Sequence, residues 1–161
     1  MELQGALTAF QLCLAEKEEA NNGAAVGAVV DGRLRAVGGW VSSHKSGIQW
    51  TKSHEVKGTR VCIAVRVQFA VSAASDLLFI DLQYLCDEII AGCIDIGVIV
   101  VPSNKLAYFL TDRVARYSDA VKAVERARAS DLPLAVLALE HDGPGPALMK
   151  RQTRQGKKTT L

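Results

Sequence analysis

A predicted strand near the middle of the chain carries the polar side chains that are best suited to binding or catalysis. Residues 61–69 are rich in β-branched side chains, and Arg66 and Gln68 fall on the same side of this predicted strand, because side chains two residues apart share a face. An arginine fork matches the geometry of a phosphate group. The same guanidinium can instead form a structural ion pair with Glu55 or Asp76. The residue types therefore indicate either phosphate binding or ion pairing at Arg66.

The common catalytic and cofactor motifs are absent from the sequence. It contains no Gly-x-x-x-x-Gly-Lys-Ser/Thr loop, no Gly-x-Gly-x-x-Gly after a strand and no Gly-x-Ser-x-Gly elbow. The three histidines, His44, His54 and His141, lie in predicted loops at spacings that match no zinc site. We therefore expect the histidines to be solvated, and we expect no metal centre built on them.

Basic side chains gather on one predicted helix and at the end of the chain. The helix predicted over 112–129 has apolar residues on one side. Its other side carries basic residues that include Arg113, Arg116, Lys122 and Arg126. After a linker rich in Gly and Pro, the last residues contain lysines and arginines but no acid. The helix face is of the kind that contacts nucleic-acid phosphates, and the tail is either a solubilising segment or a second such contact.

The elements that must position these residues alternate between strands and helices. Hydrophobic periodicity predicts a strand at 60–69, a helix at 75–91, a strand at 94–101, a helix at 112–129 and a strand at 132–139. Alternation of this kind predicts a layered α/β domain. We expect a mixed sheet in which the first of these strands is central and the other two lie beside it.

The first third of the chain is less regular. Residues 2–20 have apolar side chains at helical spacing and are predicted to form an amphipathic helix. Residues 24–58 are predicted to hold only short elements, with a turn at residues 30–33 where the sequence reads Val-Asp-Gly-Arg.

Length and composition favour one ordinary globular domain. The chain has 161 residues, of which 49% are hydrophobic and 22% charged, with a formal net charge of +2. We expect a single domain over residues 1–141 and a flexible basic tail over 142–161. No apolar run approaches the length that spans a bilayer, and the N-terminus has no basic region typical of a secretory signal. We therefore expect a cytoplasmic protein with no membrane partner.

Several stretches resemble a known enzyme family when taken in order. Ser53–Phe69 reads Ser-His-Glu-Val-Lys-Gly-Thr-Arg-Val-Cys-Ile-Ala-Val-Arg-Val-Gln-Phe, Ile94–Pro102 reads Ile-Asp-Ile-Gly-Val-Ile-Val-Val-Pro, and Leu132–Leu139 reads Leu-Pro-Leu-Ala-Val-Leu-Ala-Leu. Together with a weaker match at Leu34–Trp40, these stretches resemble the BglII-like type II restriction endonucleases of the PD-(D/E)xK nuclease superfamily. The resemblance implies a restriction-endonuclease-like three-layer α/β domain, with a central mixed sheet flanked by helices.

The resemblance also implies a catalytic site whose acids are replaced in this chain. In the family, one acid before the strand and a second acid on it hold Mg²⁺, and a third residue orients the attacking water. The matching positions here are Lys57, Arg66 and Gln68. Because two cations stand where two carboxylates hold the metal, we expect no bound metal and weak or absent DNA cleavage. Restoring both acids requires Lys57→Asp together with Arg66→Glu.

Three functions remain open from the sequence. The first is a catalytically weak or silent protein that binds duplex DNA through Arg113, Arg116, Lys122 and Arg126, and that pairs as a homodimer through the helix at 75–91, as the resemblance implies. The second is an active endonuclease with a rearranged site, in which Glu55 is the alternative acid together with Asp76. The third is a protein-interaction domain that no longer binds DNA.

Overall fold

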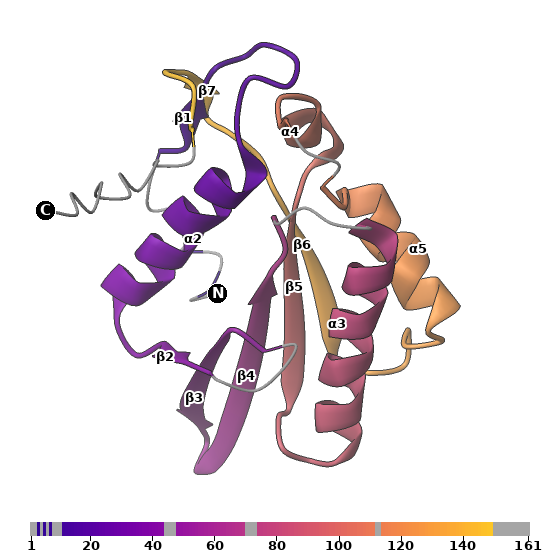
Figure 1. Cartoon of the computed structure of the whole chain (residues 1–161). Helices are drawn as coiled ribbons and strands as arrows, with labels where there is room; N and C mark the ends of the chain where they lie inside the picture. The colour runs from indigo at the N-terminus through magenta and orange to yellow at the C-terminus, as the bar shows by residue number, and fades with distance from the viewer. Residues whose placement is uncertain are drawn as a thin grey trace, which may run out of the picture.

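Helices and strands alternate around one central sheet (Figure 1). The computed structural model describes residues 3, 5, 7, 11–43, 48–69, 74–111 and 114–149. Its strands are β1 (Cys13–Leu14), β2 (Val41–Ser42), β3 (Trp50–Val56), β4 (Thr59–Val67), β5 (Ile96–Pro102), β6 (Leu134–Leu139) and β7 (Gly143–Pro144). Its helices are α2 (Gly23–Val37), α3 (Ala74–Ile90), α4 (Asn104–Tyr108) and α5 (Tyr117–Arg126). Among these residues no helix is both long and apolar enough to cross a membrane.

The central sheet is mixed, as predicted. Its strand order is β2-β3-β4-β5-β6, with antiparallel pairing from β2 to β4 and parallel pairing from β4 to β6. β4 is the middle strand and β5 lies beside it. The prediction that the strand at 132–139 also lies beside β4 is wrong, because β6 pairs with β5 instead. Each parallel strand follows a helical crossover and enters on the outer side of the preceding one.

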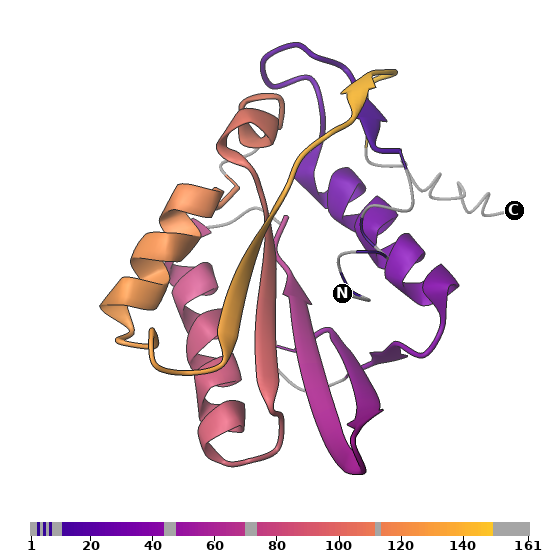
Figure 2. The ribbon, with the colours of Figure 1, turned by 180° about the vertical axis from the view of Figure 1, so that it is seen from behind.

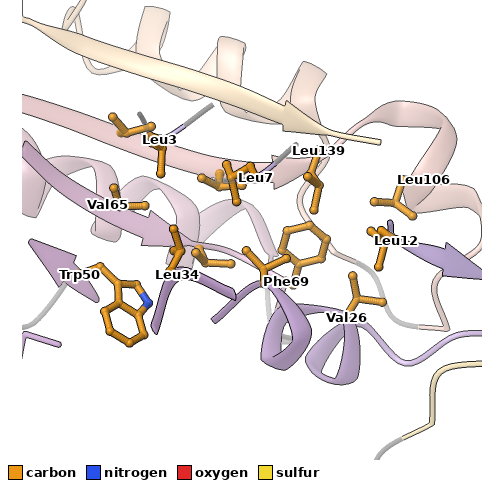
Figure 3. Packing of buried hydrophobic residues seen from close by; sticks show 14 of the residues in the cluster. Leu3, Leu7, Leu12, Val26, Leu34, Trp50, Val65, Phe69, Leu106 and Leu139 are labelled. Atoms are coloured by element: carbon orange, nitrogen blue, oxygen red, sulfur yellow. The ribbon is translucent and has the colours of Figure 1, made fainter. Parts of the chain in front are cut away.

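The molecule has three layers (Figures 1 and 2). α3 and α5 cover one face of the sheet, and α2 covers the other. Alternation along β4 divides its side chains between the two faces, so that Val65 and Val67 join the apolar cluster under α2 while Ala64 joins the cluster under α3 and α5. Figure 3 shows the first cluster, where residues of α2, β4 and the N-terminal segment meet. The predicted three-layer α/β fold is confirmed.

The predicted helix over 2–20 is confirmed only near its start, where the described residues Leu3, Gly5 and Leu7 are helical. Residues 11–20 are not helical, and Cys13–Leu14 forms a short strand that pairs in parallel with β7. Leu12 and Leu14 are both buried in the cluster under α2. Tertiary pairing with a distant segment therefore overrides the local helical pattern, which sequence periodicity alone cannot reveal.

Helix α2 replaces the short elements predicted for residues 24–37. Asn22 caps it by accepting a hydrogen bond from the Ala25 backbone N–H, and Val26, Val30 and Leu34 bury one stripe of it at helical spacing. The predicted turn at 30–33 is wrong because it lies inside this helix. The Asp-Gly pair that indicated a turn instead occupies a helical turn whose glycine, Gly32, is exposed.

The last helix and the C-terminal segment also differ from expectation. α5 is shorter than the predicted helix at 112–129, because residues 114–116 are not helical and Arg116 is its N-cap. Beyond β6, strand β7 pairs with β1, and Leu148 accepts a backbone hydrogen bond from Asn22. Residues 143–148 therefore contact the fold, and the lysines and arginines of the predicted basic tail lie outside the described residues. The division into a domain and a tail stays a prediction.

Two glycines of α2 provide a test of this helix. A Cβ at Gly23 would lie 2.5 Å from the backbone oxygen of Phe69, whereas a Cβ at Gly32 meets nothing within 4 Å. We expect Gly32→Ala to raise the free energy of unfolding by about 0.5–1 kcal/mol, because alanine is favoured in a helix. Gly23→Ala is expected to lower it by about 1–3 kcal/mol through overpacking. Urea unfolding measures both. Destabilisation by Gly32→Ala would mean that residues 30–33 form a turn.

Candidate functional site

A cavity of about 230 Å³ opens at the carboxyl end of β4. Ala24, Gly27, Ala28 and Asp31 of α2 line one side, and Gln49 and residues 66–69 line the other. Carboxyl ends of parallel strands are the usual place for ligands in α/β sheets. The cavity therefore brings Arg66 and Gln68, which the sequence predicted, together with Asp31 and Gln49, which it did not.

Arg66 is anchored to α3 by an ion pair. Its side chain leaves β4 on the face that carries Ala64, and its Nε lies 2.8 Å from Oδ2 of Asp81. The Asp81 side chain is 9% exposed and that of Arg66 is 31% exposed. Arg66 thus forms an ion pair, as one of the two alternatives predicted, but its partner is Asp81 and neither Glu55 nor Asp76. Asp81 lies further along α3 than Asp76, and only the packing of α3 on the sheet brings it to Arg66.

The environment of the Asp81 carboxyl group disfavours its charged form. Burial raises the pKa of Asp81, while the charge and the hydrogen bond of Arg66 lower it, and the net direction is upward. Desolvation therefore outweighs the attraction between the two partners. Within the described part of the chain, the two terminal nitrogens of the Arg66 guanidinium have no partner.

Asp31 is held by donors from the start of β3. Nε2 of Gln49 lies 2.7 Å from both carboxylate oxygens, and Nε1 of Trp50 lies 2.9 Å from Oδ1. The amide oxygen of Gln49 accepts from the backbone N–H of Val67. These bonds tie the helix, β3 and β4 together at the edge of the cavity. Asp31 was missed because the sequence indicated a turn there.

Gln68 is buried but its side chain has no partner. It is 4% exposed, and its backbone N–H donates to Val100. Its side-chain amide has no hydrogen bond to any described residue. Trp40 contributes the one side-chain nitrogen in the described residues that is both unpaired and sealed from solvent. The Gln68 amide therefore keeps contact with solvent, and the cavity that it lines is the adjacent opening.

Lys57 and Glu55 lie at the other end of the strand. Lys57 and Gly58 form the β3–β4 turn with positive φ angles of 51° and 79°, and Glu55 pairs with Arg60 beside this turn. Thr59 to Arg66 spans about 23 Å at about 3.3 Å per residue. The structure thus brings neither Lys57 nor Glu55 to Arg66, and it does not bring Glu55 to Asp76, which starts α3 at the opposite end.

Gln49 lines the cavity with Arg66, whereas Lys57, which the family resemblance indicated, does not. Trp50 is paired with Val65, and the Gln49 backbone N–H donates to the Val65 carbonyl oxygen. The Gln49 side chain reaches Asp31 on α2 and the Arg66 side chain reaches Asp81 on α3, so the two residues line the cavity from different faces of the sheet. The signal that could have found it is the length of the hairpin, since the turn at 57–58 sets which residues face each other.

The predicted DNA-contact residues lie on or beside α5. Arg116, Lys122 and Arg126 are exposed, while Arg113 lies outside the described residues. The Arg126 guanidinium stacks 4.7 Å from the ring centroid of Phe79 on α3. The basic residues that the structure describes are therefore accessible, and Arg126 lies at the seam between the two helices.

His141 differs from the solvated histidine that we expected. Its side chain is 1% exposed, and Nδ1 and Nε2 lie 2.6 and 2.8 Å from carboxylate oxygens of Glu140 and Glu16. Burial alone would raise the pKa of Glu140, but hydrogen bonds from Ser103 and His141 hold it below its ordinary value. This cluster joins the segment around Glu16 to the end of β6.

The side chains of the cavity do not suit Mg²⁺. Magnesium prefers carboxylate oxygens in an octahedral arrangement. Asp31 is the one carboxylate among the described residues that line the cavity, and it already accepts from Gln49 and Trp50. Arg66 adds a positive charge, and Gln49 and Gln68 are neutral. No group of three candidate metal-ligating side chains occurs among the described residues.

The comparison with known families identifies one match. The family model for restriction endonuclease BamHI matches residues 75–152, which is slightly less than half of the chain. The matched span includes α3, β5, α4, α5, β6 and β7. It supports a type II restriction-endonuclease-like family, but it does not include β4 with Arg66 and Gln68. No curated protein matches the sequence.

Replacing Asp81 by asparagine tests the energetics of the ion pair. The amide oxygen can still accept from Arg66, so we expect Asp81→Asn to change the free energy of unfolding at pH 7 by less than about 1 kcal/mol. Because the pKa of Asp81 is raised in the fold, its protonation stabilises the native state. The wild type should therefore gain stability relative to the variant as the pH falls from 7 through the raised pKa toward 3.8. Denaturant unfolding at several pH values measures this difference, and a trend of opposite sign would contradict it.

Proposed function

We propose that the protein is a duplex-DNA-binding member of the BglII-type restriction endonucleases that cleaves DNA weakly or not at all. The family match supports a DNA-binding nuclease of the type II restriction-endonuclease-like class, and enzymes of this class are generally Mg²⁺-dependent. The observation that carries the proposal is the polar lining of the cavity, where Arg66 bonds to Asp81 and the neutral Gln49 and Gln68 lie beside it.

Charge explains why this arrangement opposes metal-assisted cleavage. A divalent cation beside Arg66 meets a like charge, and this repulsion is strong at short range even in a partly solvated site. Asp31 alone cannot replace a set of carboxylates. Lys57 does not contribute here, because it lies at the far end of the hairpin. The proposal that the site lacks metal-binding acids therefore rests on Arg66 and on the neutral Gln49 and Gln68, which line the cavity.

DNA binding is supported by the accessible basic side chains. Arg116, Lys122 and Arg126 are exposed on or beside α5, and each cation that contacts a phosphate releases a counterion. We expect affinity for mixed-sequence duplex DNA to fall steeply with salt and to be indifferent to Mg²⁺. Gel shifts between about 50 and 200 mM salt, run beside a plasmid-cleavage assay with and without Mg²⁺, test both properties.

The other two functions correspond to definite outcomes of this experiment. Cleavage of plasmid by the unmodified protein, abolished by Glu55→Gln, would establish the active endonuclease with a rearranged site. Absence of DNA binding at about 50 mM salt would favour the protein-interaction domain.

Restoring acids at the site gives a sharper test of where it lies. We expect Gln49→Asp with Arg66→Glu to produce weak Mg²⁺-dependent nicking of plasmid DNA, because both new carboxylates border the cavity that Asp31 also lines. The matched control is Lys57→Asp with Arg66→Glu, whose new acids lie about 23 Å apart and should produce none. Nicking by the control but not by the first variant would refute this location of the site.

A homodimer is part of the proposal. α3 carries exposed apolar side chains at helical spacing, Leu77, Ile80 and Tyr84, and a hollow between this helix and the end of α5 adjoins them. An exposed apolar stripe on a helix is typical of a pairing surface. The position of this stripe agrees with the pairing helix that the family resemblance implies.

A further inference from the structure

The last strand of the central sheet has an unpaired outer edge. β6 pairs with β5 along one side, and it ends the strand order β2-β3-β4-β5-β6. Figure 2 looks onto this edge, where β6 lies in front of β5 and no described helix crosses it. A strand edge carries a row of backbone N–H and C=O groups that can pair with another chain. The edge of β6 is therefore a surface on which an extended chain can dock.

The register of β5 and β6 identifies the backbone groups that face outward. The Gly97 backbone N–H donates to the Pro133 carbonyl oxygen, so the backbone of Pro133 faces β5. The backbone groups of successive strand residues point to opposite sides, and the parallel pairing continues without a break to the end of β6. Val136 and Ala138 therefore direct their N–H and C=O groups away from the sheet, where no described strand pairs with them.

β6 lacks the features that usually keep an edge strand from pairing. Its six residues, Leu134–Leu139, include no charged residue, no glycine and no proline. The strand at the opposite edge, β2, has only two residues, and a very short edge strand is one of these protective features. Of the two edges of this sheet, β6 is thus the one that suits a partner.

A cavity of about 560 Å³ lies along the carboxyl end of β6. Its apolar lining includes Leu12, Val100, Leu137 and Leu139, which belong to the cluster under α2 or pack against it. Ala138, whose backbone faces outward, lines it as well. In a strand added beside β6, every second side chain would point to the face of the sheet on which this cavity lies. The lining therefore favours an apolar side chain in the partner.

The charges beside the edge also restrict the partner. Glu140 and Asp142 line the same cavity and are both exposed. Hydrogen bonds from Ser103 and His141 hold the pKa of Glu140 below its ordinary value, so this carboxylate is charged at neutral pH. The described lining contains no lysine or arginine. A partner that carries basic side chains next to its apolar ones therefore complements this edge.

A second copy of this chain complements the edge less well. Two-fold pairing of β6 with itself is antiparallel. If this pairing is centred on Val136, position 131 of one copy lies opposite position 141 of the other, so Asp131 approaches Glu140 and Asp142. Like charges that face each other across two strands are destabilising. The charges thus favour a segment of a different protein.

We propose that the outer edge of β6 binds an extended segment of a partner protein, which continues the central sheet through backbone hydrogen bonds to Val136 and Ala138. One apolar side chain of this segment enters the cavity, and a lysine or arginine contacts Glu140 and Asp142. In this mode of recognition the main chain provides affinity and alternate side chains provide specificity. The inference depends on neither DNA binding nor DNA cleavage.

Hydrogen exchange in the full chain tests whether the edge is open. We expect the N–H groups of Val136 and Ala138 to exchange at least about tenfold faster than those of Ala135 and Leu137, which face β5. Slow exchange of Val136 and Ala138 that persists on dilution would show that the edge is already covered, and would overturn the proposal. Slow exchange that is lost on dilution would assign the edge to a second copy.

A synthetic peptide tests the occupant. The probe alternates valine with threonine and ends in two lysines. We expect its saturable binding to slow the exchange of Val136 and Ala138 while leaving that of Leu137 unchanged. A peptide with glutamates in place of the lysines should bind about tenfold more weakly, because Glu140 and Asp142 repel it.

Variants of Ala138 test the backbone contact. Ala138→Pro removes an outward N–H without removing a hydrogen bond of the sheet, and proline is tolerated at such edge positions. We expect it to weaken binding of the lysine peptide at least about fivefold, measured by fluorescence anisotropy. The matched control Ala138→Val keeps the N–H and should bind within about twofold of the wild type. Urea unfolding checks that both variants are folded.

A variant of Asp142 tests the charge contact. In Asp142→Asn the amide oxygen can still accept from the Leu12 backbone N–H, as the carboxylate does. We expect this variant to weaken the lysine peptide several-fold and to leave a peptide with serines in place of the lysines unchanged. Equal binding of the lysine and glutamate peptides, undiminished binding by folded Ala138→Pro, or no saturable binding to the wild type would overturn the proposal.

Discussion

The ion pair between Arg66 and Asp81 fixes the chemical character of the site. Strand alternation directs position 66 of β4 toward α3, so a side chain there must be satisfied by that helix. Since burial keeps the pKa of Asp81 raised despite its partner, the pair adds little to stability. The apolar clusters on the two faces of the sheet hold the fold, and they impose the position of this charge.

The regular core could be predicted from the sequence, because its periodicity is local. The alternation in β4, the apolar run of β5 and the helical stripe of α3 each appear within a short window. α2 could not be recognised in the same way, since Asp31-Gly32 has the composition of a turn. Its helical state depends on Val26, Val30 and Leu34 packing against a sheet formed by residues far along the chain.

The site was predicted only where it lies on one strand. Arg66 and Gln68 share a segment and were found, whereas Gln49 and Asp31 reach the cavity through hairpin register and helix packing. The family resemblance instead indicated Lys57, which lies in the β3–β4 turn, away from the cavity. In an antiparallel hairpin, residues near the turn are close in sequence to the second strand but distant in space from its far end. Identifying cross-strand neighbours therefore requires the position of the turn to be known.

Most polar side chains around the cavity have partners within the protein. Asp31 accepts hydrogen bonds from Gln49 and Trp50, which compensate its charge. Asp81 is compensated by Arg66. The Gln68 side chain has no hydrogen bond to a described residue, and its amide keeps contact with solvent. The fold therefore satisfies the charged groups around the cavity by pairing Asp31 with Gln49 and Trp50 and by pairing Arg66 with Asp81.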